Sequence, residues 1–132
     1  MKTLKPLGIA MALMAGTAAQ AQSSPGEVTV VTEGLIAAGM AIELGDKCDS
    51  VSVRYLRGLN FLQGLKRTLS NAGFSDAEID AYIDNDTEKD RLEAIARARL
   101  ADLGVVTTQA ATYCTVANAQ IAQGTQVGRL LR

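Results

Sequence analysis

Histidine and tryptophan are absent from the 132-residue sequence, which has only two cysteines, two prolines, three tyrosines and two phenylalanines. Without histidine, the chain lacks the usual general base of cysteine and serine hydrolases. Two thiols alone do not supply the four ligands of a structural zinc site. Because aromatic rings are so few, we do not expect a surface on which sugars or bases stack. We therefore expect no enzymatic activity, no bound metal and no cofactor.

The first 21 residues have the layout of a cleavable signal peptide. Two lysines precede an uncharged apolar core at residues 7–15, which is too short for a helix across a bilayer of about 30 Å. Ala19 and Ala21 supply the small residues of a cleavage site, so Gln22 would begin the mature chain. The alternative is a buried first helix. We predict export to the periplasm and, because no later segment is long enough, no stable membrane insertion.

Cleavage would remove two of the 13 basic residues and none of the 14 acidic ones, leaving a formal charge of −3. A general nucleic-acid binder usually has a basic excess, so we expect no nucleic-acid partner. The mature length suits one domain with a single core. We predict a flexible or extended linker over residues 22–32 and a single helical domain over residues 33–132.

The two cysteines, Cys48 and Cys114, permit one intramolecular disulfide. Thiols in oxidising compartments are usually paired, and closing so long a loop would stabilise the fold by about 4 kcal/mol. The spacing is not that of a redox-active C-x-x-C pair. We predict a structural bond, with an intermolecular disulfide and a functional thiol as the alternatives.

Apolar residues recur at helical spacing through most of the mature chain. The clearest local signal is the capping box of Ser75 and Glu78, with Phe74 and Ile79 as its hydrophobic staple. Gly73 and the later Gly104 are typical helix stops. We predict a compact all-α bundle of about five helices held by one disulfide, with the helices near 33–47, 50–71, 76–84, 87–103 and 108–123.

The second of these helices has the strongest amphipathic pattern. Its predicted buried face contains Tyr55, Leu56, Leu59, Leu62, Leu65 and Leu69. Basic residues lie toward its other side, and two more arginines lie near the end of the sequence. A solvated helix surface is the favoured explanation of these residues, and we keep them as a candidate interaction face: Arg54, Arg57, Lys66, Arg67, Arg129 and Arg132.

Two further segments invite a functional interpretation. The acidic run at residues 80–90 resembles a calcium loop, but an EF-hand beginning at Asp84 requires glycine at Lys89 and glutamate at Ile95. A solvated helix junction explains it better. The final IAQGTQVGRLLR either docks on the domain or serves as a tail for another protein, and the spacing of Val127 and Leu130 favours docking.

The segments CDSVSVRYLRGLNFLQGLK, GFSDAEIDAYI, a later YC and the final IAQGTQVGRLLR together resemble a family of small exported, two-cysteine helical proteins of Gram-negative bacteria whose function is unknown. The resemblance runs from about Glu33 to Arg132 and depends on the order of the motifs. It implies a periplasmic helical domain and carries over no catalytic residue.

These observations favour a periplasmic, non-enzymatic interaction or structural module that binds another periplasmic protein. One alternative is a periplasmic stress chaperone, by analogy of size, export and single disulfide with small acid-stress chaperones. The other is a binder of a small apolar ligand between helices, which requires a cavity.

Overall fold

The computed structural model describes residues 24–132, and the predicted signal peptide and its cleavage site therefore lie outside the described residues. The described chain is all-α, as predicted, with five longer helices, a short sixth and an isolated β-bridge. The elements are η1 (Pro25–Glu27), α1 (Thr29–Lys47), α2 (Tyr55–Asn71), α3 (Asp76–Ile83), α4 (Asp86–Asp102), α5 (Ala110–Gln123) and α6 (Gln126–Arg129).

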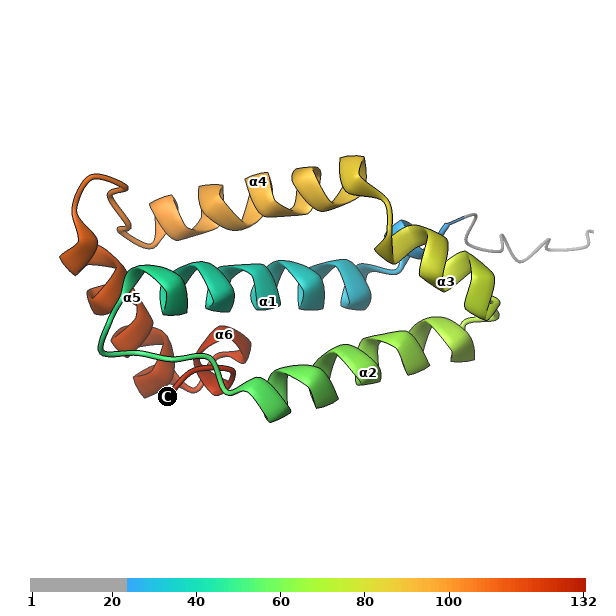
Figure 1. The fold of residues 1–132 in the computed structure, drawn as a ribbon, viewed down its shortest axis with the longest axis horizontal. Helices are drawn as coiled ribbons and strands as arrows, with labels where there is room; N and C mark the ends of the chain where they lie inside the picture. The colour runs from blue at the N-terminus through green and yellow to red at the C-terminus, as the bar shows by residue number, and fades with distance from the viewer. Residues whose placement is uncertain (1–23) are drawn as a thin grey trace, which may run out of the picture.

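Three long helices form one layer, with α1 between α2 and α4 (Figure 1). Helix α2 runs antiparallel to α1, and α4 runs parallel to it. Helix α3 links α2 to α4 at one end of the layer, while α5 and α6 lie at the other end and contact α1. The central helix α1 thus contacts almost every other element, and the fold is organised around it.

The apolar core has two parts. The larger surrounds the second half of α1, where Leu44 is fully buried with Leu100 of α4, Tyr113 and Ala117 of α5 and Leu130. The smaller lies at the opposite end of α1 and contains Val28, Val31, Leu65, Leu69 and Ile79, with Phe74 packed against it. Helix α1 therefore contributes buried residues to both parts of the core.

Gly34 allows α1 and α2 to pack closely in the smaller core. A Cβ atom at this position would lie 2.8 Å from Cδ2 of Leu65, well inside van der Waals contact. Substitution there would force the leucine to move. This glycine weakens the helix locally but permits the close approach of its neighbour.

The start of α1 differs from the predicted boundary. We expected a linker over residues 22–32, but η1 begins at Pro25 and α1 begins at Thr29, so residues 24–32 are not a linker. The β-branched residues here suggested extended backbone. Burial of Val28 and Val31 in the smaller core overrides that propensity, as tertiary packing commonly does.

The predicted cap of α3 is confirmed. The Ser75 hydroxyl accepts a hydrogen bond from the Glu78 amide at 3.2 Å, and the Ser75 amide donates to the Glu78 carboxylate at 2.7 Å. Gly73 and Gly104 follow α2 and α4 with φ of 97° and 114°, the left-handed region in which glycine is unstrained.

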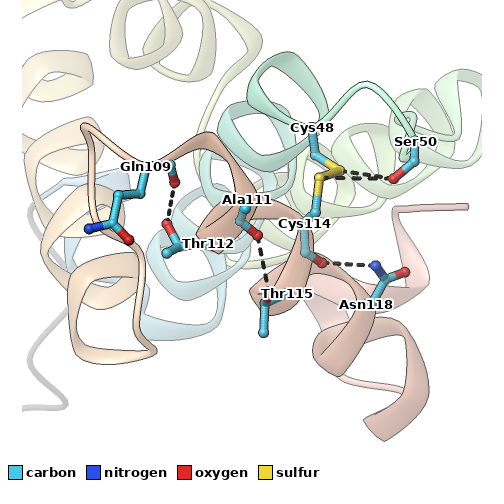
Figure 2. The surroundings of a disulfide bond; sticks show 8 residues. All are labelled: Cys48, Ser50, Gln109, Ala111, Thr112, Cys114, Thr115 and Asn118. Atoms are coloured by element: carbon cyan, nitrogen blue, oxygen red, sulfur yellow. Dashed lines mark hydrogen bonds between the residues drawn. A yellow bond between two sulfur atoms is a disulfide. The ribbon is translucent and has the colours of Figure 1, made fainter.

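A disulfide joins Cys48 and Cys114, with the sulfurs 2.09 Å apart (Figure 2). Cys48 ends α1 and is buried, and Cys114 lies in α5. The Ser50 hydroxyl lies 3.2 Å from the Cys48 sulfur. The bond fixes the end of the central helix to the helix that closes the larger core, which confirms the predicted pairing.

The C-terminal segment, residues 125–132, docks on the domain. Thr125 caps α6 by accepting a hydrogen bond from the Gly128 amide at 3.0 Å. Beyond α6, Leu131 forms an antiparallel bridge with Val53, in the connection before α2. Val127, Leu130 and Leu131 are buried. Of the two interpretations left open by the sequence, the docked one is correct.

Candidate functional site

Four of the six residues on the predicted buried face of α2 are exposed. Leu65 and Leu69 are buried as expected, but Tyr55 and Leu56 are 77% and 78% exposed, and Leu59 and Leu62 are 50% and 37% exposed. The prediction that these four side chains lie in the core is wrong, because nothing within residues 24–132 covers the first half of α2 on this side. An amphipathic pattern identifies an apolar face but not what packs against it.

Two adjoining hollows extend this exposed surface across α1. One, of about 330 Å³, lies between α1 and the first half of α2, and its lining includes Tyr55 and Leu59. The other, of about 220 Å³, lies between α1 and the junction of α3 with α4, and its lining includes Ile83 and Leu92. Both are lined by Ala38, Ile42 and Leu62, so they are continuous. We call their union the open groove.

The open groove has a floor of small side chains and walls of large ones. Ala38 and Gly39 of α1 line the floor, and a Cβ atom on Gly39 would contact only Ala96, at 3.6 Å. Ile42 rises between the two hollows and is 51% exposed although it lies on the central helix. Leu59 of α2 lines one hollow and Ile83 at the end of α3 lines the other, and both side chains are exposed. The shape is that of a channel along α1.

Charged side chains border the open groove mainly on its α4 side. Glu88 and Glu93 lie there with Lys89, and Asp46 lies at the end of α1. Arg91 holds the pKa of Glu88 below its usual range through hydrogen bonds of 2.6 and 2.9 Å. Arg97 lies 3.5 Å from Glu93, so both glutamates on the α4 side are paired with arginines of the same helix.

Tyr82 also lines the groove and donates a hydrogen bond of 3.1 Å to Glu88. Partial burial, followed by this hydrogen bond and the charge of Glu88, raises the pKa of the Tyr82 phenol to about 12. The phenol therefore remains a neutral donor at any physiological pH.

A second concave surface lies on the opposite side of α1. We call it the opposite hollow; its volume is about 610 Å³, and Val30, Ala37 and Met40 line its α1 side. At 100° per residue, these positions lie about a third of a turn around α1 from Ala38 and Ile42. The other lining residues come from α2, α4 and the C-terminal segment: Phe61, Leu65, Arg99, Asp102, Leu103, Thr125, Gln126 and Val127.

An ion pair stands at the rim of the opposite hollow. The Arg99 guanidinium donates to both carboxylate oxygens of Glu33, at 2.6 and 2.8 Å. These hydrogen bonds hold the pKa of Glu33 below its usual range. The pair links α1 to α4, and the rest of the lining is largely apolar.

The predicted basic face is divided in two by the fold. Arg57 donates to the Arg129 carbonyl at 3.2 Å, and Arg132 donates to the Ser52 hydroxyl at 3.4 Å, so these arginines gather at the C-terminal segment. Lys66 and Arg67 instead line a shallow surface that also contains two aspartates of α3, and Lys66 lies 3.9 Å from Asp80.

Arg54 belongs to the first group, through its backbone amide, which donates to the Leu130 carbonyl at 2.8 Å. Among the described residues, its Nε atom is buried without a hydrogen-bond partner. Arg54, Arg57 and Arg132 thus contact the C-terminal segment or its neighbours, whereas Lys66 and Arg67 lie beside the aspartates of α3.

The sequence interpretation missed Ile42 and Ile83 as surface residues. A signal was available, because α1 carries apolar side chains on every side, a pattern typical of a helix covered all round. An exposed isoleucine on such a helix marks an uncovered face. The sequence pattern alone does not show which face of α1 stays uncovered, because that depends on the neighbours of α1.

The chain belongs to a family of unknown function (DUF5333), which matches residues 24–132. The match covers the whole described part of the chain, and it confirms the resemblance at that level alone. No curated protein and no solved structure matches the chain.

Two general features of residues 24–132 bear on the site. None of their helices has both the length and the apolar character needed to cross a bilayer. They also contain no group of three or more cysteine, aspartate or glutamate side chains placed to hold a metal ion.

Proposed function

We propose that this protein is an exported, non-enzymatic interaction module of the periplasm, which binds another protein at the open groove. The observation that carries the proposal is the run of exposed large apolar residues around one continuous channel, from Tyr55 and Leu59 through Ile42 to Ile83. Contiguous exposed apolar surface commonly marks an interaction site on a small protein.

Export is supported by two observations of different kinds. The first 21 residues have the pattern of a signal peptide. Cys48 and Cys114 form a disulfide, a bond that persists in oxidising compartments and is rare in the cytosol. The second observation does not depend on the first.

The groove is a better candidate than the basic residues or the end of the chain. The C-terminal segment already packs on the domain with three apolar side chains buried. Arg57 and Arg132 donate hydrogen bonds within or beside that segment. A partner would have to displace these contacts, whereas the groove residues are exposed without any rearrangement.

A substitution in the groove tests the proposal. A tagged protein expressed at native level is crosslinked in cells, and co-purifying proteins are identified for the wild type, Leu59→Asp and Asn60→Asp. Asn60 is also exposed on α2 but faces away from the groove. We expect one stoichiometric partner that is lost with Leu59→Asp and retained with Asn60→Asp.

Retention of the same partner by Leu59→Asp would refute the groove as the binding surface. A broad set of clients that appears only after acid or heat treatment would favour the stress chaperone. Cytoplasmic fractionation of the protein, with residues 1–21 still attached, would refute export.

A second candidate function is the binding of a small apolar ligand in the opposite hollow. Its volume of about 610 Å³ lies within the range of pockets that hold drug-sized molecules, and its lining is mostly apolar. A fluorescent apolar probe such as N-phenylnaphthylamine tests it. Binding that is lost with Ala37→Leu but unchanged by Leu59→Asp would support this function, and no binding by the wild type would refute it.

A further inference from the structure

We infer that the arginines gathered at the docked C-terminal segment bind a phosphoryl group, either free or carried by a lipid headgroup. The residues are Arg54, Arg57, Arg129 and Arg132, which we call the arginine cluster. This site is a second one, beyond the proposed function, and its ligand does not depend on what binds the open groove.

The docked C-terminal segment brings the arginines of the cluster together from two distant parts of the sequence. The Arg54 amide donates to the Leu130 carbonyl at 2.8 Å, directly beside Arg129. The Arg57 guanidinium donates to the Arg129 carbonyl at 3.2 Å, and the Arg132 guanidinium donates at 3.4 Å to a hydroxyl in the connection before α2. Positive side chains from the start of α2 and from the end of the sequence therefore share one end of the molecule.

No guanidinium of the arginine cluster has a carboxylate within ion-pair distance among residues 24–132. The ion pairs of this part of the chain all involve other basic residues: Lys66, Arg91, Arg97 and Arg99. Asp46 and Asp49 lie at and just beyond the end of α1, yet neither pairs with an arginine. Positive charges held together without a counter-ion repel one another, so a bound anion would be favoured.

Arg54 shows most clearly that an anion would fit. Its side chain is partly buried, and nothing in residues 24–132 accepts a hydrogen bond from its guanidinium. The Nε atom is buried, but the two terminal nitrogens are not, so a ligand can reach them. A partly buried cation without an acceptor costs free energy. An oxyanion beside Arg54 would recover part of that cost.

The start of α2 adds donors at the same place. The amides of Tyr55, Leu56 and Arg57 donate to no group in the described chain, and this helix has neither a capping side chain nor an acidic residue in its first turn. Helices α3 and α4, in contrast, have both. Free amides and the positive end of a helix dipole attract anions, and here they lie beside unpaired guanidinium groups.

The number of donors selects a phosphoryl group over a carboxylate. One guanidinium is enough for a carboxylate in this protein, because Arg99 alone binds both oxygens of Glu33. A phosphate monoester has about −1.5 to −2 charges and three acceptor oxygens, which suit several arginines at once. Each guanidinium has five N–H groups. Arg57, Arg129 and Arg132 each have one printed bond, so a phosphoryl group can bind without displacing the docked segment.

Titration calorimetry with inorganic phosphate, at constant ionic strength, tests the site in the disulfide-bonded protein, with acetate as the carboxylate control. We expect phosphate to bind and acetate to bind much more weakly. Arg54→Gln and Arg57→Gln should each weaken phosphate binding by about tenfold, the effect of losing a charged hydrogen bond. Arg67→Gln is the matched control, because it removes the same charge from α2 outside the cluster, and it should bind phosphate like the wild type.

Vesicles distinguish the two sources of the phosphoryl group. Cosedimentation is measured with phosphatidylglycerol and with phosphatidylcholine vesicles. Binding to phosphatidylglycerol alone, lost in Arg57→Gln, would assign the site to a lipid headgroup even without binding of free phosphate. Binding of free phosphate without cosedimentation would assign it to a soluble ligand.

Three results would overturn the inference. They are no binding of either phosphate or phosphatidylglycerol, equal binding of phosphate and acetate, and an equal loss in Arg67→Gln and Arg57→Gln, which would reflect overall charge. Circular dichroism checks that the variants fold. Arg129→Gln guards against a loosened C-terminal segment, because it keeps the carbonyl to which Arg57 donates, and it should also weaken binding.

Discussion

Ser52 and Arg132 exchange two backbone hydrogen bonds, of 2.9 and 3.0 Å, although they are 80 residues apart in the sequence. The pairing holds the C-terminal segment against the connection that leads from the disulfide into α2. The segment is therefore part of the domain, as the spacing of its apolar residues predicted. Its apolar side chains Val127, Leu130 and Leu131 are buried, whereas those around the open groove are exposed.

Gly128→Ala is expected to loosen the C-terminal segment. A Cβ atom at Gly128 would overlap the carbonyl oxygen of Gln120, which is backbone and cannot turn aside. We expect a loss of about 1–3 kcal/mol in the free energy of unfolding, typical of overpacking. Hydrogen exchange should show faster exchange at the amides of Ser52 and Arg132.

Gly58→Ala is the matched control, since a Cβ atom there meets nothing within 4 Å. Within α2 it should stabilise the protein by up to about 1 kcal/mol through helix propensity. Equal effects of the two substitutions would contradict the close contact between α6 and α5.

Replacing both cysteines with alanine is expected to lower the free energy of unfolding by about 4 kcal/mol, because the bond closes a loop of 66 residues. Urea denaturation of the oxidised wild type and the double variant measures the difference. Since a small domain has only about 5–15 kcal/mol of stability, the variant should be close to unfolding at 37 °C. A change below about 1 kcal/mol would mean that the helices hold the fold without the bond.

The ion pair at the opposite hollow predicts a pH dependence. The hydrogen bonds from Arg99 lower the pKa of Glu33 in the folded state, so the pair stabilises the fold above pH 4.5 and loses this effect as the pH falls further. Because the pair is half exposed, Glu33→Gln should cost only about 0.2–1 kcal/mol at pH 7. Urea unfolding at pH 7 and pH 3 should show the difference shrinking, and an equal difference at both values would contradict it.

Tyr82 provides a spectroscopic test of the contact between α3 and α4. The difference in absorbance at 295 nm between the wild type and Tyr82→Phe should follow a single ionisation with a pKa of about 12. A folded-state pKa raised in this way contributes stability that is lost as the pH rises from 10 to 12. Glu88→Gln should lower the pKa, since it removes a negative charge beside the phenol. A difference step near pH 10 would show that the phenol is neither partly buried nor bonded to Glu88 in solution.

Local signals predicted the start of α3 and the ends of α2 and α4 well, because caps and stops depend on a few neighbouring residues. Helix α2 begins at Tyr55, five residues after the predicted start. Ser75 with Glu78 and the glycines after α2 and α4 are examples. The start of α1 was predicted four residues too late, since the propensity of Val28 and Val31 for extended backbone is opposed by burial against α2 and α3. That burial depends on residues distant in the sequence.

The candidate site was harder to predict for a related physical reason. Hydrophobic spacing in α2 identifies Tyr55 and Leu59 as apolar-face residues, but burial requires a neighbouring element, and the described chain has none there. The basic residues show a different dependence on the fold. Arg57 and Arg129 are both exposed, and the docked segment brings them together through the hydrogen bond from Arg57 to the Arg129 carbonyl.

Site-specific photocrosslinking in living cells tests the groove most directly. A photoreactive benzoylphenylalanine is placed at Ile42 or Leu59 in the groove, at Val30 in the opposite hollow, and at Asn60 on the outer side of α2. All four positions are exposed. We predict one discrete crosslinked partner from Ile42 and Leu59, and none from Val30 or Asn60. No crosslink from either groove position, or the same partner from Val30, would contradict the assignment of the open groove as the binding surface.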